Sequence, residues 1–308
     1  MCRRLTIIFV AVLLALSSAP AFAQELNVVA TIAPLGSIAS NVMAGAGHPQ
    51  VLIPVTASPQ SFVPTPEQIG TLKAAQVVIW IGPLLEKSLA KTISALPKTT
   101  HVITVSRLPG IKLLPMRPAG IWSEAASLAA GSKAKSAINP YLWLDPENAS
   151  VIARAINQAL SLVDSNDAAV YQANADSFTA QVQALEYELQ ATLGPVHKVP
   201  FLVLHDSYAY LDQKYRLNDV GAVTAEPGQA VSAKRIALLR AAIQKTHVQC
   251  IFSEPQYRPT TAAKLAQGLP VHIGVLDPYG TGVSMGPNGY FSMMNRLADG
   301  IADCLSSP

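Results

Sequence analysis

The stretch AAVYQANADSFTAQVQALEYELQATL, residues 168–193, contains neither glycine nor proline. Its large apolar residues recur at spacings of seven, four, three and four, and they are Tyr171, Phe178, Val182, Leu185 and Leu189. These spacings place them on one face and predict a single helix about 26 residues long. An ordinary core helix would show the same pattern. The position of this helix between two groups of predicted strands favours a rigid connector.

Short apolar segments alternate with helical segments on both sides of this helix, which is typical of parallel sheets covered by helices. The predicted strands before it are NVVAT (27–31), VLIPV (51–55), QVVIWIG (76–82) and HVITV (101–105), and those after it are FLVLH (201–205), VQCIFSE (248–254) and VHIGVLD (271–277). Asp145 and Pro146 are expected to begin a shorter helix as its N-cap and first residue. We predict an α/β fold of two lobes, each a parallel sheet flanked by helices, joined by a long rigid connector helix.

These elements divide the mature chain into three parts. They are an N-terminal lobe (24–165), the connector helix (166–194) and a C-terminal lobe (195–308). Residues 115–138 in the first lobe are rich in Ala, Ser, Gly and Pro and have no clear period. This composition predicts a mobile surface loop.

The amino terminus has the features of a cleavable signal peptide (1–23). Arg3 and Arg4 form a basic start, LTIIFVAVLLAL (5–16) is apolar, and APAFAQ supplies an Ala-x-Ala site with cleavage expected after Ala23. The apolar run is too short to span a bilayer. The pattern therefore predicts an exported protein, with an uncleaved anchor as the alternative.

The charge pattern argues against a nucleic-acid binder. Charged residues make up 13% of the chain, and the formal net charge is +3. Nucleic-acid-binding domains concentrate Lys and Arg on one face, and this sequence has no such cluster.

Cys250 and Cys304 are the cysteines that remain after the signal peptide. An oxidising compartment favours a disulfide between them. Two buried free thiols are the alternative.

Two ionisable residues end predicted strands of the second lobe. His205 ends FLVLH, and Asp277 ends VHIGVLD. Ligands of open parallel sheets sit beyond the carboxyl ends of the strands, and His with Asp forms half of a typical metal shell. A buried structural histidine is the alternative. Glu254 also ends a predicted strand, and we expect it to be structural.

One motif suggests an enzyme but lacks its context. GVSMG (282–286) matches the G-x-S-x-G nucleophile pattern around Ser284. That mechanism requires a helix directly after the serine and a histidine later in the chain. PNG follows at once, and no histidine lies beyond His272. We therefore expect no enzyme.

Six motifs in order carry a family resemblance over nearly the whole mature chain. They are TIAPLGSIASNVMAG, VLIPVTASPQSFVPTPEQIGTLKAAQVVIWIGPLLEKSL, LWLDP, FLVLHDSYAYLDQKY, VQCIFSEPQYRP and GVLDPYGTG. The sequence resembles the ZnuA family, periplasmic zinc-binding components of bacterial ABC importers, within a wider group that includes manganese carriers. The resemblance implies a periplasmic monomer that takes a metal ion, zinc being favoured, into the cleft between its lobes. It also implies delivery to an inner-membrane ABC permease driven by its ATPase. The positions of Cys250 and Cys304 resemble those of the family disulfide.

The resemblance implies four metal-ligand positions, of which two are altered. Family members usually have a histidine after Ser-Pro, where this sequence has Gln60, and another in a motif like HLWL, where it has Tyr141. The second lobe keeps His205 in LHDSY and Asp277 in LDPYG. The histidine-rich loop common in the family has no histidine here.

Three hypotheses follow from this altered set. The chain is a zinc carrier with an unusual shell, a carrier of another metal or of a small organic solute, or a periplasmic protein that has lost transport. Imidazole and carboxylate bind zinc better than an amide oxygen. A Tyr141 phenolate with His205 and Asp277 would suit ferric iron by ligand type. In the second hypothesis, Gln60 and Tyr141 form hydrogen bonds and do not coordinate metal.

Overall fold

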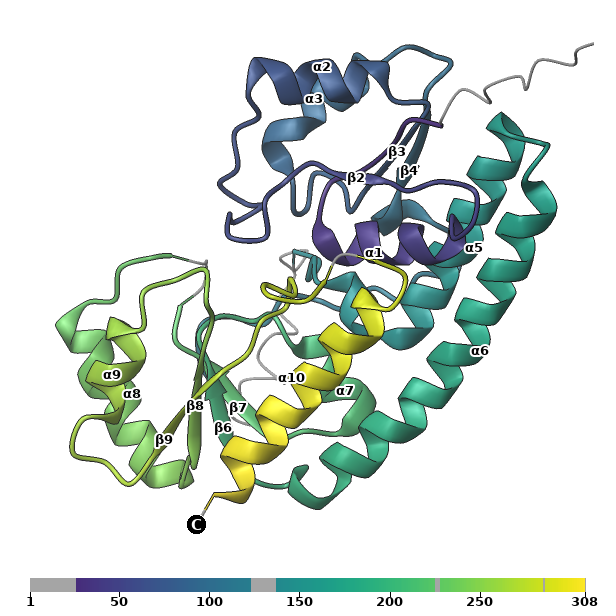
Figure 1. Ribbon diagram of the computed structural model, residues 1–308. Helices are drawn as coiled ribbons and strands as arrows, with labels where there is room; N and C mark the ends of the chain where they lie inside the picture. The colour runs from purple at the N-terminus through teal and green to yellow at the C-terminus, as the bar shows by residue number, and fades with distance from the viewer. Residues whose placement is uncertain (1–25, 123–136, 225–227, 285, 308) are drawn as a thin grey trace, which may run out of the picture.

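The computed structural model describes residues 26–122, 137–224, 228–284 and 286–307. The predicted signal peptide lies outside these residues, as do residues 123–136 of the predicted loop. Two sheets lie in separate lobes beside a pair of long helices (Figure 1). No helix in the described part of the chain is both long enough and apolar enough to span a membrane.

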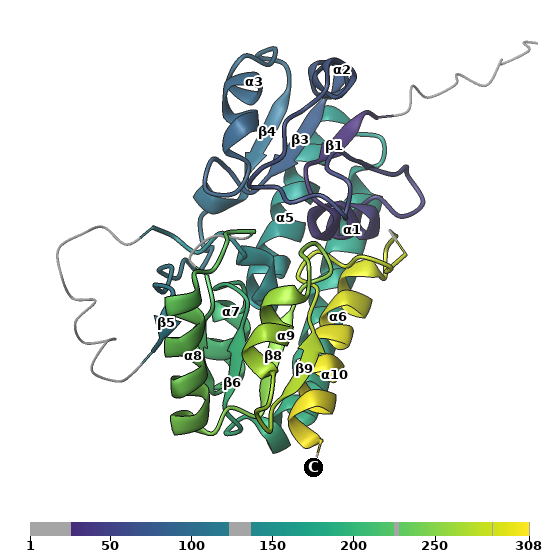
Figure 2. The same ribbon diagram turned by 90° about the vertical axis from the view of Figure 1, so that its left-hand side faces the viewer.

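The first lobe contains a parallel sheet with the strand order β2-β1-β3-β4. Its elements are β1 (Val28–Ala30), α1 (Ala33–Val42), β2 (Gln50–Val51), α2 (Pro66–Ala74), β3 (Val77–Trp80), η1 (Lys87–Leu89), α3 (Ala90–Ser94), β4 (His101–Thr104) and η2 (Val105–Arg107). All four residues of the central strand β3 are buried, because helices cover both faces of the sheet (Figure 2). The strand predicted at 51–55 is shorter, since Pro54 has no N–H to continue the pairing.

The second lobe contains a five-stranded sheet with the order β5-β7-β6-β8-β9. Its elements are β5 (Gly120–Ile121), β6 (Phe201–Val203), α7 (Ala209–Tyr215), β7 (Asp219–Ala222), α8 (Ala233–Thr246), β8 (Cys250–Ser253), α9 (Thr260–Ala266), β9 (His272–Val275) and α10 (Gly289–Ser306). All pairs are parallel except β5 with β7. The short strand β7 was not predicted, because Asp219 and Gly221 interrupt its apolar pattern.

Strand β5 lies within the segment 115–138, which the sequence predicts to be a mobile surface loop. Gly120 pairs with Ala222 and Ile121 pairs with Gly221, so this piece of the first half of the chain forms an edge of the second sheet. Residues 115–122 are therefore held against the second lobe and do not belong spatially to the first. A strand of only two residues, one of them a glycine, is too short to leave a periodic signal.

The long helix predicted at 168–193 is confirmed. Helix α6 spans Ala168–Leu193, and all five residues of the predicted apolar stripe are buried. It packs against α5 (Pro146–Val163), against α1 of the first lobe and against α10 of the second. This shared packing ties the lobes together along one side (Figure 1). The short turns η3 (Leu142–Leu144) and η4 (Gly194–Val196) flank the helix pair.

Two local predictions are also confirmed. The Asp145 side chain caps α5 by accepting a hydrogen bond from the Glu147 N–H, with Pro146 as the first helical residue. Cys250 in β8 and Cys304 in α10 form a disulfide with a Cα–Cα distance of 6.1 Å. The disulfide closes a sequence separation of 54 residues and fixes the last helix to the sheet.

Candidate metal-binding site

Three neighbouring strands of the second sheet end in ionisable side chains. His205, Glu254 and Asp277 follow β6, β8 and β9 within two residues of each strand end. His205 and Glu254 are each only 2% exposed, whereas Asp277 is half-buried. The carboxyl edge of this sheet therefore places an imidazole and two carboxyl groups near the junction with the first lobe, as expected for an open parallel sheet.

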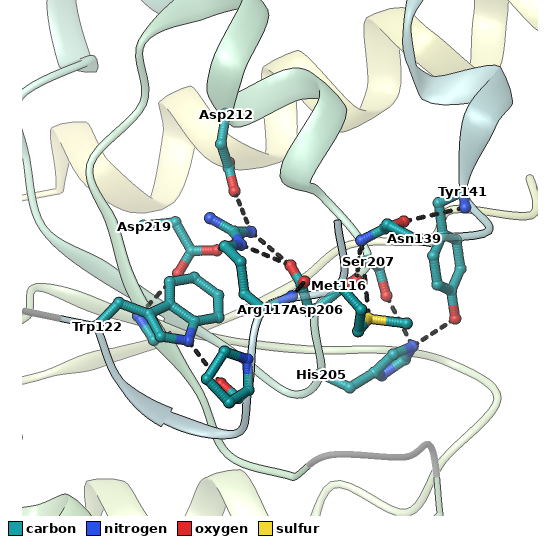
Figure 3. A network of polar contacts seen from close by, with 12 residues as sticks. Met116, Arg117, Trp122, Asn139, Tyr141, His205, Asp206, Ser207, Asp212 and Asp219 are labelled. Atoms are coloured by element: carbon teal, nitrogen blue, oxygen red, sulfur yellow. Dashed lines mark hydrogen bonds and ion pairs between the residues drawn. The ribbon is translucent and has the colours of Figure 1, made fainter. Parts of the chain in front are cut away.

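Three of the four predicted site residues meet at this junction. The Tyr141 hydroxyl lies 2.6 Å from His205 Nε2 and accepts a hydrogen bond of 2.8 Å from Gln60 Nε2. Gln60 comes from the first lobe, Tyr141 from the segment just before η3, and His205 from the second lobe. Figure 3 shows the Tyr141 hydroxyl directed at the His205 ring.

Asp277 is held by a different set of hydrogen bonds. Its Oδ1 accepts hydrogen bonds from Gln256 Nε2 at 2.8 Å and from the Tyr279 N–H at 3.0 Å, and its Oδ2 accepts one from the Thr281 N–H. Thr281 Oγ1 also reaches across to the Val55 carbonyl of the first lobe at 3.2 Å. The Asp277 carboxylate therefore holds a turn that contacts both lobes. Among the described residues, no three His, Cys, Asp or Glu side chains are grouped closely enough to hold a metal ion.

Several hydroxyl groups around His205 were not singled out from the sequence. Ser207 Oγ lies 2.7 Å from His205 Nε2 and donates to Glu254 Oε1 at 3.1 Å. Tyr208 donates to the same Glu254 oxygen at 3.3 Å. The Tyr279 hydroxyl lies 3.4 Å from that of Tyr141. The run His-Asp-Ser-Tyr after a buried strand is the signal that could have indicated the first two.

Burial favours the uncharged forms of His205, Glu254 and Tyr141 through their pKa values. It lowers the pKa of His205 to about 3 and raises the pKa of Glu254 to about 8. The pKa of Tyr141 also lies above its ordinary value, first through burial and then through the nearby Glu254 charge. His205 is therefore a neutral imidazole able to bind a metal. A Tyr141 phenolate, which the ferric hypothesis requires, is opposed by its surroundings.

Some buried polar atoms beside the site have no hydrogen-bond partner. Among the described residues, they include His205 Nδ1, Glu254 Oε2, Gln256 Oε1 and Tyr257 Oη. The Tyr257 ring packs edge-on against the His205 ring at 5.8 Å between centroids. Buried polar atoms are rarely left without a partner, so this group has unused capacity for a polar or cationic ligand.

A network of hydrogen bonds next to the site fixes the segments that carry His205 and Tyr141 relative to each other (Figure 3). Asn139 Nδ2 donates to the Asp206 carbonyl at 2.7 Å, and Asn139 Oδ1 accepts from the Tyr141 N–H at 3.1 Å. Arg117 donates its N–H and Nε–H to the Asp206 carboxylate at 2.6 and 2.8 Å. Asp206 thus has a structural role next to His205.

The Arg117 guanidinium also joins two other aspartates. Its Nη2 lies 2.7 Å from Asp212 and 3.2 Å from Asp219. The guanidinium stacks on the Trp122 ring at 3.7 Å from its centroid. The Arg117 cation therefore forms ion pairs with three buried carboxyl groups, those of Asp206, Asp212 and Asp219.

The family profile described as "ZnuA: Zinc-uptake complex component A periplasmic" matches residues 28–304. This chain belongs to the ZnuA family. The resemblance drawn from the six motifs is thereby confirmed. The family is one of transport components, in keeping with the expectation that the chain is not an enzyme.

Curated ZnuA relatives match over most of their length. The high-affinity zinc uptake system protein ZnuA of Brucella suis biovar 1 is 30% identical over 306 residues, which cover 91% of this chain and 92% of that protein. ZnuA of Yersinia pestis is 29% identical over 290 residues, which cover 90% of this chain and 91% of that protein.

Solved structures share the fold. A crystal structure of ZnuA has a TM-score of 0.77 at 23% identity, covering 92% of this chain and 100% of that chain. The solute-binding protein FpvC from Pseudomonas aeruginosa, in complex with Mn²⁺, has a TM-score of 0.76 at 21% identity, covering 92% and 99%. These matches confirm the predicted two-lobed α/β fold.

Proposed function

We propose that this chain is the periplasmic metal-binding component of a zinc ABC importer. It is exported through its signal peptide, binds the cation between its lobes and delivers it to an inner-membrane permease driven by an ATPase. The observation that carries the proposal is the neutral, buried imidazole of His205, whose Nε2 lies beside the Tyr141 hydroxyl, which in turn is bonded to Gln60 at the junction of the lobes.

The chain's own groups account for both binding and release. Binding of the cation at His205 Nε2 displaces the hydroxyl contacts of Tyr141 and Ser207. Oxygen atoms of Gln60 and Tyr141 then complete the shell, and Asp277 supplies negative charge from the adjacent turn. Separation of the lobes removes Gln60 from His205, because the two residues belong to different lobes. Release therefore follows from lobe movement.

A specific observation favours manganese as a second candidate cargo. The groups around His205 are mainly oxygen donors, namely an amide, hydroxyls and carboxyl groups. Manganese prefers oxygen ligands, whereas zinc prefers shells rich in imidazole. Both metals therefore belong in the same binding experiment.

Replacing His205 by alanine is expected to weaken zinc binding by about 100-fold or more, since loss of an outer-shell partner alone costs about 10–100-fold. Calorimetric titration of the metal-free mature protein with Zn²⁺ and with Mn²⁺ measures this. His101→Ala, a change at a half-buried histidine in strand β4, is the matched control and leaves affinity unchanged. Equal affinities for the wild type and His205→Ala would contradict the proposed site. Binding of neither metal would contradict the proposed function.

A further inference from the structure

Glu254 faces the side of the His205 ring that points away from Tyr141. Its Oε1 lies 3.4 Å from His205 Nδ1, and both side chains are buried. That separation is longer than an ordinary N–H···O hydrogen bond. Neither His205 Nδ1 nor Glu254 Oε2 has a hydrogen-bond partner within the described residues.

The direction of the surrounding hydrogen bonds identifies Glu254 Oε1 as an acceptor. The hydroxyls of Ser207 and Tyr208 both donate to this oxygen, at 3.1 and 3.3 Å. Oε1 is therefore an acceptor, and the proton that burial keeps on this carboxyl group belongs on Oε2. The Nδ1 atom facing Oε1 is the donor.

The other side of the ring leads to the same assignment. The Tyr141 oxygen already accepts from Gln60 Nε2, so its own proton is directed at His205 Nε2, 2.6 Å away. Ser207 Oγ lies 2.7 Å from the same Nε2 and 3.1 Å from Glu254 Oε1, so its single proton has an acceptor at either atom when Nε2 is bare. With Nδ1 protonated and Nε2 bare, every hydroxyl proton in the group has an acceptor. With the opposite tautomer, the Tyr141 proton loses His205 Nε2 as its acceptor and is left with the Tyr279 hydroxyl at 3.4 Å, and a bare Nδ1 faces a carboxyl oxygen.

We propose that Glu254 is a positioning residue for the metal ligand: its Oε1 accepts the Nδ1–H of His205 and so keeps the Nε2 lone pair directed at the metal. A carboxyl oxygen that accepts the free ring N–H of a metal-bound histidine fixes the tautomer and the ring orientation of that ligand. This inference rests on the proposed function, because it assigns to His205 the role of metal ligand.

The first test uses the metal-free protein and does not depend on metal binding. Two-bond ¹H–¹⁵N correlation spectra of histidine-labelled protein report which ring nitrogen carries the proton, with His205→Ala used to assign the signal among the six histidines. We expect the Nδ1–H tautomer in the wild type. Glu254→Ala loses this preference, whereas Glu254→Gln retains it, because the amide oxygen can still accept at the same place. A wild-type Nε2–H tautomer would overturn the proposal.

The second test measures zinc affinity. Glu254→Ala is expected to bind zinc about 10–100-fold more weakly, with most of the loss restored in Glu254→Gln. Glu86→Gln is the matched control, since Glu86 is a buried glutamate in the first lobe whose partners are Thr31 and the N–H groups of Ile81 and Gly82. A folded Glu254→Ala protein with wild-type affinity would overturn the positioning role. If His205→Ala also kept wild-type affinity, the proposed metal site itself would fail, and the tautomer spectra would still decide whether Glu254 orients the ring.

Discussion

Changing Gln60 and Tyr141 together to histidine is expected to raise zinc affinity by about 1,000-fold, or about 4 kcal/mol of binding free energy. Both side chains already belong to one chain of contacts that ends at His205, with Gln60 bonded to Tyr141 and Tyr141 lying 2.6 Å from His205 Nε2. Two imidazole nitrogens would replace an amide and a phenol, and imidazole is the better zinc ligand. The change also removes the Tyr141 phenol, whose proton is directed at the lone pair of His205 Nε2.

The measurement is a competition titration against a chelator of known zinc affinity, with the two single variants alongside. A matched control adds the same two histidines elsewhere, through Gln158→His and Tyr187→His. Gln158 is exposed on α5, and Tyr187 on α6 is 80% exposed. The control should leave the tight site unchanged. No gain in the Gln60 and Tyr141 variant would mean that these positions do not face the bound metal.

Replacing Arg117 by alanine is expected to lower the free energy of unfolding by about 3–5 kcal/mol, the usual result of removing one partner of a buried ion pair. The guanidinium is the cation that serves Asp206, Asp212 and Asp219. Its loss leaves three buried carboxyl groups without a counter-charge and removes the stacking on Trp122.

This destabilisation should depend on pH with a definite sign. Burial raises the pKa of Asp212 and of Asp219 above the ordinary aspartate value of 3.8. The folded protein therefore binds these protons more tightly than the unfolded chain, and stability falls as pH rises through the raised pKa values. Removing the cation raises both pKa values further. The difference between Arg117→Ala and the wild type should thus be largest above neutral pH and shrink toward pH about 4.

Urea unfolding at several pH values between about 4 and 8 measures the effect. Arg117→Lys keeps the charge but loses the planar set of donors, so we expect an intermediate stability. Arg154→Ala, at an exposed arginine on α5, is the control and should change stability little. A destabilisation of Arg117→Ala that stays constant with pH would contradict the assigned role of the carboxyl groups.

Much of the candidate site could be predicted from the sequence because its residues follow strands. His205 and Asp277 end two apolar runs, and the ends of parallel strands meet at one edge of a sheet. The altered positions Gln60 and Tyr141 followed from the motifs that surround them. Their contact with His205 could not be predicted, because Gln60 and Tyr141 lie 81 residues apart and Tyr141 and His205 lie 64 apart.

The sequence by itself determined the α/β class, the division into two lobes and the long helix α6, because local periodicity and punctuation by Gly and Pro are properties of neighbouring residues. Only the tertiary structure decided that the Asp277 carboxylate accepts hydrogen bonds within its own turn and that Glu254 lies next to His205 Nδ1. It also decided that residues 115–122 are held against the second sheet. Arg117 shows the physical reason, since it meets aspartates 89 to 102 positions away. Contacts of that separation form only when the chain has packed, and they leave no periodic pattern in the sequence.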